Sequence, residues 1–183
     1  TLLDKIIHKN IIITRKEDGT SMTIINNIDN IIICSRNYIL NKSDNHYFDI
    51  INKYDIENKL KHLGLHIAIQ GEIVGLKING NHLKLNDIDF FVFNIWDIKN
   101  QCYLVLDEVL AITDKLGLKY VPILYNGICT NEMATLKYLL TFANNTEYSK
   151  KNPAEGIVIK MNDKNIPMIS FKVLSNKYLM KNN

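Results

Sequence analysis

The sequence has few of the residues that define disulfide-rich, metal-binding or membrane proteins. Its three cysteines, Cys34, Cys102 and Cys129, are odd in number and widely spaced, which excludes a disulfide framework and a zinc knuckle. The histidines show no His-Glu-x-x-His or His-x-His spacing. No apolar run approaches the roughly 20 residues that cross a bilayer, and the first residues lack the core of a signal peptide. These absences predict an intracellular protein of the cytoplasm, the nucleus or a virus-infected host cell, with no membrane partner.

Two common glycine-rich phosphate loops are also missing. The chain contains no Gly-x-Gly-x-x-Gly and no loop that ends in Gly-Lys-Ser or Gly-Lys-Thr, so a doubly wound dinucleotide fold is disfavoured. The 183 residues are 46% hydrophobic and 22% charged, which is typical of an ordinary globular protein. The net charge of +3 is compatible with a polyanionic partner but does not by itself indicate one.

Strand patterns dominate both ends of the chain, and helical patterns lie between them. We expect strands at 11–16, 21–28, 30–36, 65–74, 89–96, 120–124, 156–161 and 168–173, and helices at 47–54, 55–63, 104–116 and 131–142. Turn residues at 26–30 and 163–165 predict hairpins, Asp44 or Asn45 is expected to cap the first helix, and the polar segment 144–153 is expected to be a loop. Without repeats or a linker, this pattern predicts one α+β domain with largely antiparallel sheets.

The most informative segment is Lys16-Glu17-Asp18-Gly19, which follows an apolar strand. Alternation along the strand places Thr14, Lys16 and Asp18 on one face, and Gly19 permits a turn that most residues resist. A lysine amine attacks phosphorus only as the free base, a form that burial or neighbouring cations favour. The segment therefore predicts a nucleophile, although an exposed Lys–Asp pair at a hairpin mouth would give the same letters.

Four further charged residues lie within or beside apolar strands. A carboxylate is costly to bury alone, so Glu72 is expected either at a site or facing solvent at a sheet edge. Lys160 and Lys172 would hold phosphate oxygens if they share a cleft with Lys16, and their repulsion would favour its neutral amine. Glu155 would bind the divalent ion that accompanies nucleotide phosphates. Two snorkelling lysines and an edge carboxylate are the alternative interpretation.

Together, these segments resemble the covalent nucleotidyltransferase superfamily of RNA ligases, DNA ligases and mRNA-capping enzymes. They are most similar to ATP-dependent RNA ligases that join 3′-OH and 5′-phosphate ends. The matching segments, in chain order, are Lys16–Gly19 with Thr20 and Ser21, Cys34–Asn37, Gly71–Gly75, Phe90–Ile95, Glu155–Lys160 and Ser170–Val173, and the segment Ser175–Leu179 is also similar. Six motifs in the expected order make the resemblance specific, whereas any single motif is common by chance.

The resemblance implies a fold and a reaction. The fold would be α+β, with two packed, largely antiparallel sheets and flanking helices, the ATP-grasp-like core of nucleotidyltransferase ligases. Lys16 would attack the α-phosphate of ATP and release pyrophosphate. AMP would then pass to an RNA 5′-phosphate, and a 3′-OH would displace it to seal the strand. The implied partners are therefore RNA ends or nicks that carry a 3′-OH and a 5′-phosphate.

The resemblance also implies roles for the other residues. Phe93 would stack on adenine, Arg36 and Glu72 would hold the ribose and the reacting end, and Asp18 and Gly19 would belong to the nucleotide site. Glu155 would bind Mg²⁺ or Mn²⁺ or its waters. Lys160 and Lys172 would stabilise the negative charge of the phosphates.

The sequence departs from the superfamily pattern at three places. Leu174 stands where many members carry a second lysine, and the segment Gly75–Asn81 lacks the expected Pro-Gly pair. Arg15 stands where an acidic residue often precedes the nucleophile, so no adenine contact is assigned to it. We expect residues 1–183 to be a nucleotidyltransferase domain, a catalytic fragment whose OB-type or other nucleic-acid-binding domain lies outside this chain.

Three other functions fit the same residues. A DNA ligase and an mRNA-capping-type guanylyltransferase share the covalent lysyl-nucleotide step. A nucleotide- or nucleic-acid-binding module without catalysis is the alternative of another class, and Leu174 favours it.

Overall fold

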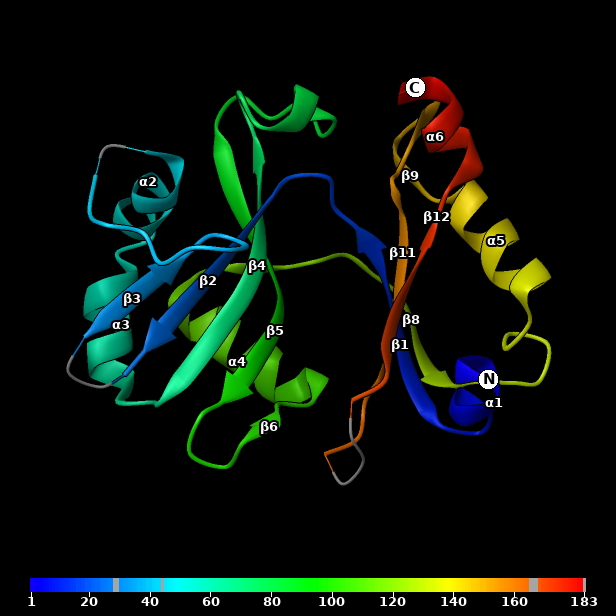
Figure 1. Cartoon of the computed structure of the whole chain (residues 1–183), viewed down its shortest axis with the longest axis horizontal. Helices are drawn as coiled ribbons and strands as arrows, with labels where there is room; N and C mark the ends of the chain where they lie inside the picture. Colours follow the sequence, from blue (N-terminus) through cyan, green and yellow to red (C-terminus); the bar gives the residue numbers. More distant parts are fainter. Residues whose placement is uncertain (28–29, 44, 165–167, 183) are drawn as a thin grey trace. The chain divides into compact units, whose positions relative to one another are not determined.

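The computed structural model describes residues 1–27, 30–43, 45–164 and 168–182, and the chain divides into two compact units (Figure 1). Unit 1 consists of Thr1–Asp18 with Val121–Asn183, and unit 2 is the continuous segment Gly19–Tyr120. Each unit has its own sheet and its own hydrophobic core. The combination of helices with largely antiparallel sheets confirms the predicted α+β class.

Unit 1 is built on a four-stranded antiparallel sheet in the order β12-β11-β1-β8. These strands are β1 (Asn10–Lys16), β8 (Ile123–Ile128), β11 (Gly156–Met161) and β12 (Ser170–Leu174). A two-stranded hairpin consists of β9 (Glu147–Ser149) and β10 (Asn152–Pro153), and the helices are α1 (Leu2–Ile6), α5 (Leu136–Asn145) and α6 (Asn176–Asn182).

The core of unit 1 lies on one face of this sheet. Ile11 and Ile13 of β1 alternate into it, because successive side chains of a strand point to opposite faces. Ile159 of β11 lies directly opposite Ile13. Helix α5 packs against β11 and β12 and contributes Leu139 and Ala143 to the same core (Figure 1).

Unit 2 is built on a six-stranded sheet in which β3-β2-β4-β5-β6 are antiparallel and β7 pairs with β5 in parallel. The strands are β2 (Thr20–Asn26), β3 (Ile31–Cys34), β4 (Ile67–Gly75), β5 (Ile88–Asp97), β6 (Cys102–Tyr103) and β7 (Lys119–Tyr120). The helices are α2 (His46–Lys53), α3 (Ile56–Leu63) and α4 (Leu106–Leu116), with a short 3-10 turn η1 (Asn79–Asn81). Its core combines sheet residues such as Ile69 and Phe90 with Ile50 and Leu60 from the helices.

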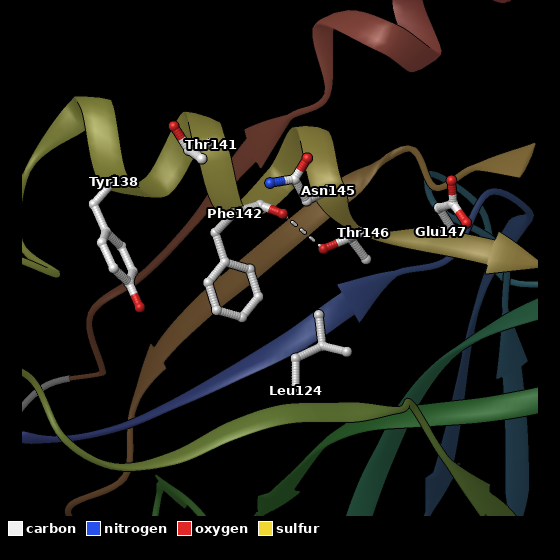
Figure 2. A pocket seen from close by; sticks show the side chains of 7 residues that line it. All are labelled: Leu124, Tyr138, Thr141, Phe142, Asn145, Thr146 and Glu147. Carbon is white, nitrogen blue, oxygen red and sulfur yellow. Dashed lines mark hydrogen bonds between the residues drawn. The ribbon is translucent and has the colours of Figure 1, made fainter. Parts of the chain in front are cut away.

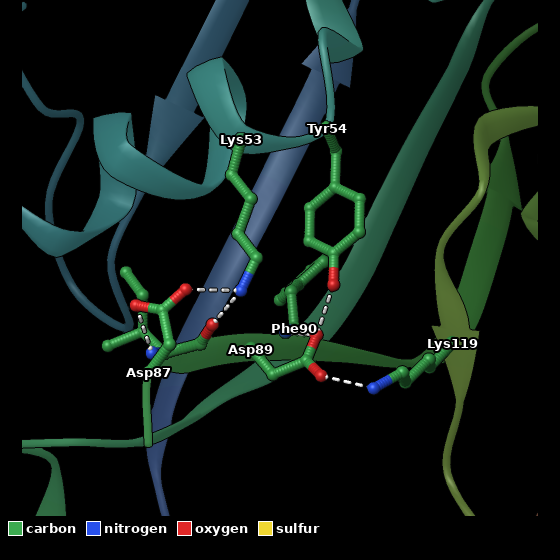
Figure 3. Close-up of polar contacts among 7 residues, drawn as sticks. Lys53, Tyr54, Asp87, Asp89, Phe90 and Lys119 are labelled. Carbon is green, nitrogen blue, oxygen red and sulfur yellow. Dashed lines mark hydrogen bonds and ion pairs between the residues drawn. The ribbon is translucent and has the colours of Figure 1, made fainter. Parts of the chain in front are cut away.

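A polar network joins the end of helix α2 to the start of β5 (Figure 3). Lys53 donates to Asp87 at 2.6 Å and to the carbonyl of Ile88 at 2.5 Å. Asp89 accepts from the hydroxyl of Tyr54 and, at 2.5 Å, from Lys119 of β7. Burial raises the pKa of Asp89, but the hydrogen bonds from Lys119 and Tyr54 outweigh it and hold the pKa below its ordinary value. The network fixes the beginning of the strand that carries Phe93.

Several predicted elements agree with the structure, with ends that shift by one or two residues. The strand 156–161 matches β11, and α4 ends at Gly117, whose φ of 68° suits a residue without a Cβ. Asn45 caps α2, since its side chain accepts from the amides of Tyr47 and Phe48. The alternative cap, Asp44, lies outside the described residues, as do Ile28 and Asp29 of the first turn and Asn165 of the second.

Two predicted strands were wrong in extent. The strand at 30–36 ends at Cys34, because the next residues form a turn in which the amide of Ser35 donates to the carbonyl of Tyr38 at 2.9 Å. The strand at 120–124 is interrupted by Pro122, which has no N–H to donate to a ladder. The chain instead forms β7 before Pro122 and the longer β8 after it.

The helix predicted at 131–142 starts five residues later, at Leu136. Two threonines offer caps: Thr130 accepts from the amide of Met133 and Thr135 from that of Tyr138, both at 3.3 Å. Only the second begins a helix, and Met133 of the intervening turn is buried in the core. The loop predicted at 144–153 is wrong as well, since it contains the β9–β10 hairpin, with Lys151 at a φ of 63° in its turn. The short helices α1 and α6 were not predicted.

Candidate functional site

Lys16 and Glu155 form an ion pair at one end of the unit 1 sheet. Lys16 is the last residue of β1 and lies opposite Gly156, the first residue of β11. Its amine donates to Oε2 of Glu155 at 2.5 Å, and the two side chains are 21% and 19% exposed. The fold thus brings together two of the predicted site residues from opposite ends of the chain.

All three predicted site lysines lie on the same face of this sheet. On β1, Ile12 and Lys16 alternate with the core residues and so point away from the core. Lys160 lies opposite Ile12, and Lys172 lies opposite Val158, two residues from Lys160 on β11. Paired residues of antiparallel strands share a face, so the three amines project on the side opposite the core.

The three lysines differ in their surroundings. Lys172 is exposed, whereas Lys160 is 5% exposed. Burial lowers the pKa of Lys160 to about 8, because a buried site disfavours the ammonium form. Lys160 therefore changes charge near pH 8, at a lower pH than an ordinary lysine.

Two tyrosine hydroxyls contact the segment that carries Lys16. The hydroxyl of Tyr148, on β9, donates to the carbonyl of Lys16 at 3.0 Å and accepts from the amide of Glu155 at 3.2 Å. The hydroxyl of Tyr178, on α6, donates to the carboxylate of Asp18. Burial raises the pKa of both tyrosines, so both hydroxyls keep the proton that they donate.

The guanidinium of Arg15 contacts both Glu17 and the ring of Tyr148. Its Nε donates to Glu17 at 2.7 Å, and its guanidinium lies over the ring of Tyr148, 5.1 Å from the centroid. Glu17 is 4% exposed; burial raises its pKa, and the charge of Arg15 opposes that rise. Arg15 therefore anchors the nucleophile segment to the β9–β10 hairpin.

In unit 2, Gly19 packs closely against β4. A Cβ at this position would lie 2.1 Å from the carbonyl oxygen of Ile73 and 2.9 Å from Cγ of Glu72. The chain bends at Gly19, as predicted, but the φ of Gly19 is not positive, so a left-handed backbone is not the reason for the glycine. The glycine is required because the backbone approaches β4, which leaves no room for a side chain.

Glu72 and Phe93 lie on neighbouring strands of the unit 2 sheet. Glu72 is half-buried and pairs with Ser21 on one side and Phe91 on the other. A bulge follows in β5: Val92 lies opposite Gly71 and Asn94 opposite Gln70, so Phe93 is the extra residue. Phe93 is half-buried and lies outside the unit 2 core.

Arg36 lies in an exposed turn after β3 and not in a strand. The hydroxyl of Ser35 accepts from the amide of Tyr38 at 3.2 Å and closes the turn. The predicted site residues are divided between the two units. Unit 1 carries Lys16, Asp18, Glu155, Lys160 and Lys172, and unit 2 carries Gly19, Arg36, Glu72 and Phe93.

No group of three or more His, Cys, Asp or Glu side chains that could hold a metal ion occurs in the described residues. Glu155 is compatible with a magnesium or manganese ion nonetheless, since such ions are commonly held by one or two carboxylates together with substrate phosphates. In the same part of the chain, no helix is long and apolar enough to cross a membrane.

A groove of about 510 Å³ lies elsewhere in unit 1 (Figure 2). Tyr138 and Phe142 of α5 and Leu124 of β8 give it an apolar floor. None of the predicted site residues lines this groove. The hydroxyl of Thr146 donates to the carbonyl of Phe142 at 2.9 Å and closes the end of the helix beside it.

Tyr148 and Tyr178 were not among the residues predicted from the sequence. Tyr148 lies in a polar segment that we expected to be a loop, and its position on a short hairpin gave no periodic signal. Tyr178 was part of a segment similar to the ligases, which was the only available signal for it.

The family model described as RNA ligase matches residues 9–178, so the chain belongs to the RNA ligase family. No curated protein matches the sequence.

Solved structures of Naegleria gruberi RNA ligase are similar to the chain. The form with pyrophosphate has a TM-score of 0.89 at 32% identity. A lysine-to-alanine variant with ATP and Mn and a lysine-to-methionine variant with AMP and Mn each have a TM-score of 0.88 at 31% identity. Each alignment covers 98% of this chain and 53% of the Naegleria chain, so this chain spans about half the length of those chains. The predicted family and fold are confirmed.

Proposed function

We propose that the protein is an ATP-dependent RNA ligase and that residues 1–183 hold its adenylylation part, with Lys16 as the nucleophile. The observation that carries the proposal is the Lys16–Glu155 pair on the face that also bears Lys160 and Lys172. A nucleoside triphosphate carries several negative charges, and three lysine amines on one face of a sheet provide positive charge that can bind them. Membership of the RNA ligase family supports the same reaction.

The proposed reaction has three steps. The Lys16 amine attacks the α-phosphorus of ATP, so that a P–N bond forms, the P–O bond to pyrophosphate breaks and the amine loses a proton. Glu155 is within hydrogen-bond reach of that amine and offers the proton a route away. An oxygen of an RNA 5′-phosphate then attacks the phosphorus of the lysyl-AMP, so that a P–O bond forms, the P–N bond breaks and the Lys16 amine takes back a proton. Finally, a 3′-OH attacks that phosphate, a phosphodiester forms and AMP leaves.

The protein would contribute mainly position and charge to these steps, as phosphoryl transfer generally requires. Lys160 and Lys172 would bind phosphate oxygens. Asp18, Gly19, Arg36, Glu72 and Phe93 would belong to the nucleotide site, with Phe93 against the base. A Mg²⁺ or Mn²⁺ ion, held by Glu155 and the triphosphate, would neutralise phosphate charge. The Naegleria ligase structures with ATP and Mn support this choice of nucleotide and metal.

A covalent-labelling experiment tests the proposal. The protein is incubated with radiolabelled ATP or GTP and a divalent ion, then denatured and resolved on a gel. We expect label from ATP and none from GTP. Label from GTP alone indicates a guanylyltransferase, and binding of ATP without covalent label indicates a module without catalysis.

Sealing needs its own assay, because the Naegleria chains are about twice as long. RNA and DNA substrates, each carrying a 3′-OH and a 5′-phosphate at a nick or at free ends, are compared after preadenylylation. Joining of RNA supports the RNA ligase proposal, and joining of DNA alone contradicts it. For the whole protein, we propose an additional domain, outside residues 1–183, that binds nucleic acid.

Phe93→Ala is expected to weaken ATP binding by about 1–3 kcal/mol, because a base stacked on an aromatic ring loses its contact. Binding is measured by calorimetry. Phe91→Leu is the matched control, since Phe91 is the neighbouring aromatic and lies beneath Lys119. ATP affinity that is unchanged in Phe93→Ala rejects Phe93 as the stacking residue.

ATP affinity is expected to fall as the pH rises above about 8, where Lys160 loses its proton. The charged form binds phosphate, so the contribution is nearly complete at pH 7, is halved at about pH 8, and falls by roughly tenfold in all between pH 7 and pH 9. Titration calorimetry between pH 7 and pH 9 measures this decrease, with Lys16→Ala protein to prevent covalent reaction. Lys160→Arg keeps its charge and should flatten the profile. An equally steep profile in that variant refutes the role of Lys160.

A further inference from the structure

Tyr148 joins the backbones of Lys16 and Glu155. Its hydroxyl donates to the Lys16 carbonyl at 3.0 Å and accepts from the Glu155 amide at 3.2 Å. The pairing of β1 with β11 ends at Lys16 opposite Gly156, and Glu155 lies just before that pair. The hydroxyl therefore supplies a bridge at the point where the backbone ladder between the two strands stops.

The position of the Tyr148 ring is itself fixed. Tyr148 is half-buried on β9, and the guanidinium of Arg15 lies over its ring. Arg15 also reaches the carbonyl of Glu147 at 3.5 Å and is held by Glu17. Because Arg15 is itself held by Glu17, it restrains the ring, and the ring in turn holds the hydroxyl near both backbone groups.

We propose that Tyr148 is a positioning residue for lysine adenylylation, whose hydroxyl holds the Lys16 and Glu155 backbones together and so aligns the amine with the carboxylate. The inference rests on the proposed function of Lys16. Tyr148 acts through two backbone groups, so its loss should affect the rate of the covalent step and leave ATP binding alone. Small displacements of a reacting group are known to reduce rates by large factors.

The test is Tyr148→Phe, which removes one oxygen and keeps the ring over which Arg15 lies. We expect the rate of lysyl-AMP formation at saturating ATP to fall on the order of tenfold, with the half-saturating ATP concentration unchanged. The matched control is Tyr125→Phe in the same sheet, since the Tyr125 hydroxyl donates to the Ile128 carbonyl at 2.8 Å, away from Lys16. That variant should adenylylate at the wild-type rate.

Three results would overturn the inference: a wild-type rate in Tyr148→Phe, an equal loss in Tyr125→Phe, or a weakening of ATP binding that accounts for the whole loss. A second measurement does not depend on ligase activity. Amide hydrogen exchange at Glu155 should be faster in Tyr148→Phe than in wild type, because the N–H loses its acceptor, and unchanged in Tyr125→Phe.

The two proposals fail in different ways. If wild-type protein forms no lysyl-AMP, the proposed function is wrong. Whether Tyr148 positions the Lys16 amine is then tested by the rate at which an N-hydroxysuccinimide ester acetylates Lys16, measured by peptide mapping. A changed rate at Lys16 in Tyr148→Phe, with Lys137 unchanged, supports the alignment, and equal rates at Lys16 reject it.

Discussion

Lys16→Ala is expected to abolish the covalent AMP adduct completely, because the protein then has no amine at the end of β1. The adduct is measured as the intact-mass increase after incubation with ATP and a divalent ion. The fold should survive, since Lys16 and Glu155 lie at the end of the sheet and neither belongs to the hydrophobic core of unit 1. Circular dichroism checks that the fold is retained.

Lys137→Ala is the control for this variant. Lys137 is an exposed lysine of α5 in the same unit, outside the proposed site, and its removal should leave the adduct intact. An adduct that persists in Lys16→Ala contradicts the assignment of the nucleophile. Peptide mapping of that adduct then identifies the lysine that carries it.

Gly156→Ala is expected to lower the free energy of unfolding by roughly 2–3 kcal/mol. The φ of Gly156 is 155°, and an added Cβ would lie 2.1 Å from the carbonyl oxygen of Val173 and 2.9 Å from Cα of Leu174. Both contacts are backbone atoms of β12, so relief requires the β11–β12 pairing to shift. Adenylylation should decrease as well, because Gly156 lies directly opposite Lys16.

Gly127→Ala is the matched control, a glycine in β8 of the same sheet. Its φ is not positive, and an added Cβ would first meet the Tyr125 hydroxyl at 3.0 Å, the end of a side chain that can rotate away. Urea denaturation followed by circular dichroism compares both variants with wild type. Equal midpoints for all three proteins refute the claim that backbone crowding at Gly156 matters.

The sequence predicted which charged residues interrupt apolar strands, and these include Lys16, Lys160 and Lys172. It did not predict that the three share a face, because that depends on the register between β1, β11 and β12, and the observed register places them on one face. The contact between Lys16 and Glu155 depended on the resemblance, since it joins segments 139 residues apart in the sequence.

The rest of the site depends on long-range packing that local patterns do not encode. The need for a glycine at position 19 comes from the approach to Ile73, and a single sequence does not show which backbones approach one another. The bulge that makes Phe93 the extra residue of β5 results from pairing with β4. Tyr148 lies in a three-residue strand, too short for its alternation to stand out.

The order in which the chain is synthesised gives the two units different folding histories. Unit 2 is one continuous segment, Gly19–Tyr120, and can fold as soon as its last residue has left the ribosome. Lys16 is translated early, but β11, β12 and α6 of the same unit are translated after unit 2. The hydrogen bond from Tyr178 to Asp18 joins residues that are 160 positions apart in the sequence. Loop closure over such distances is slow. The contacts of the proposed nucleophile segment are therefore completed only after α6 has been synthesised.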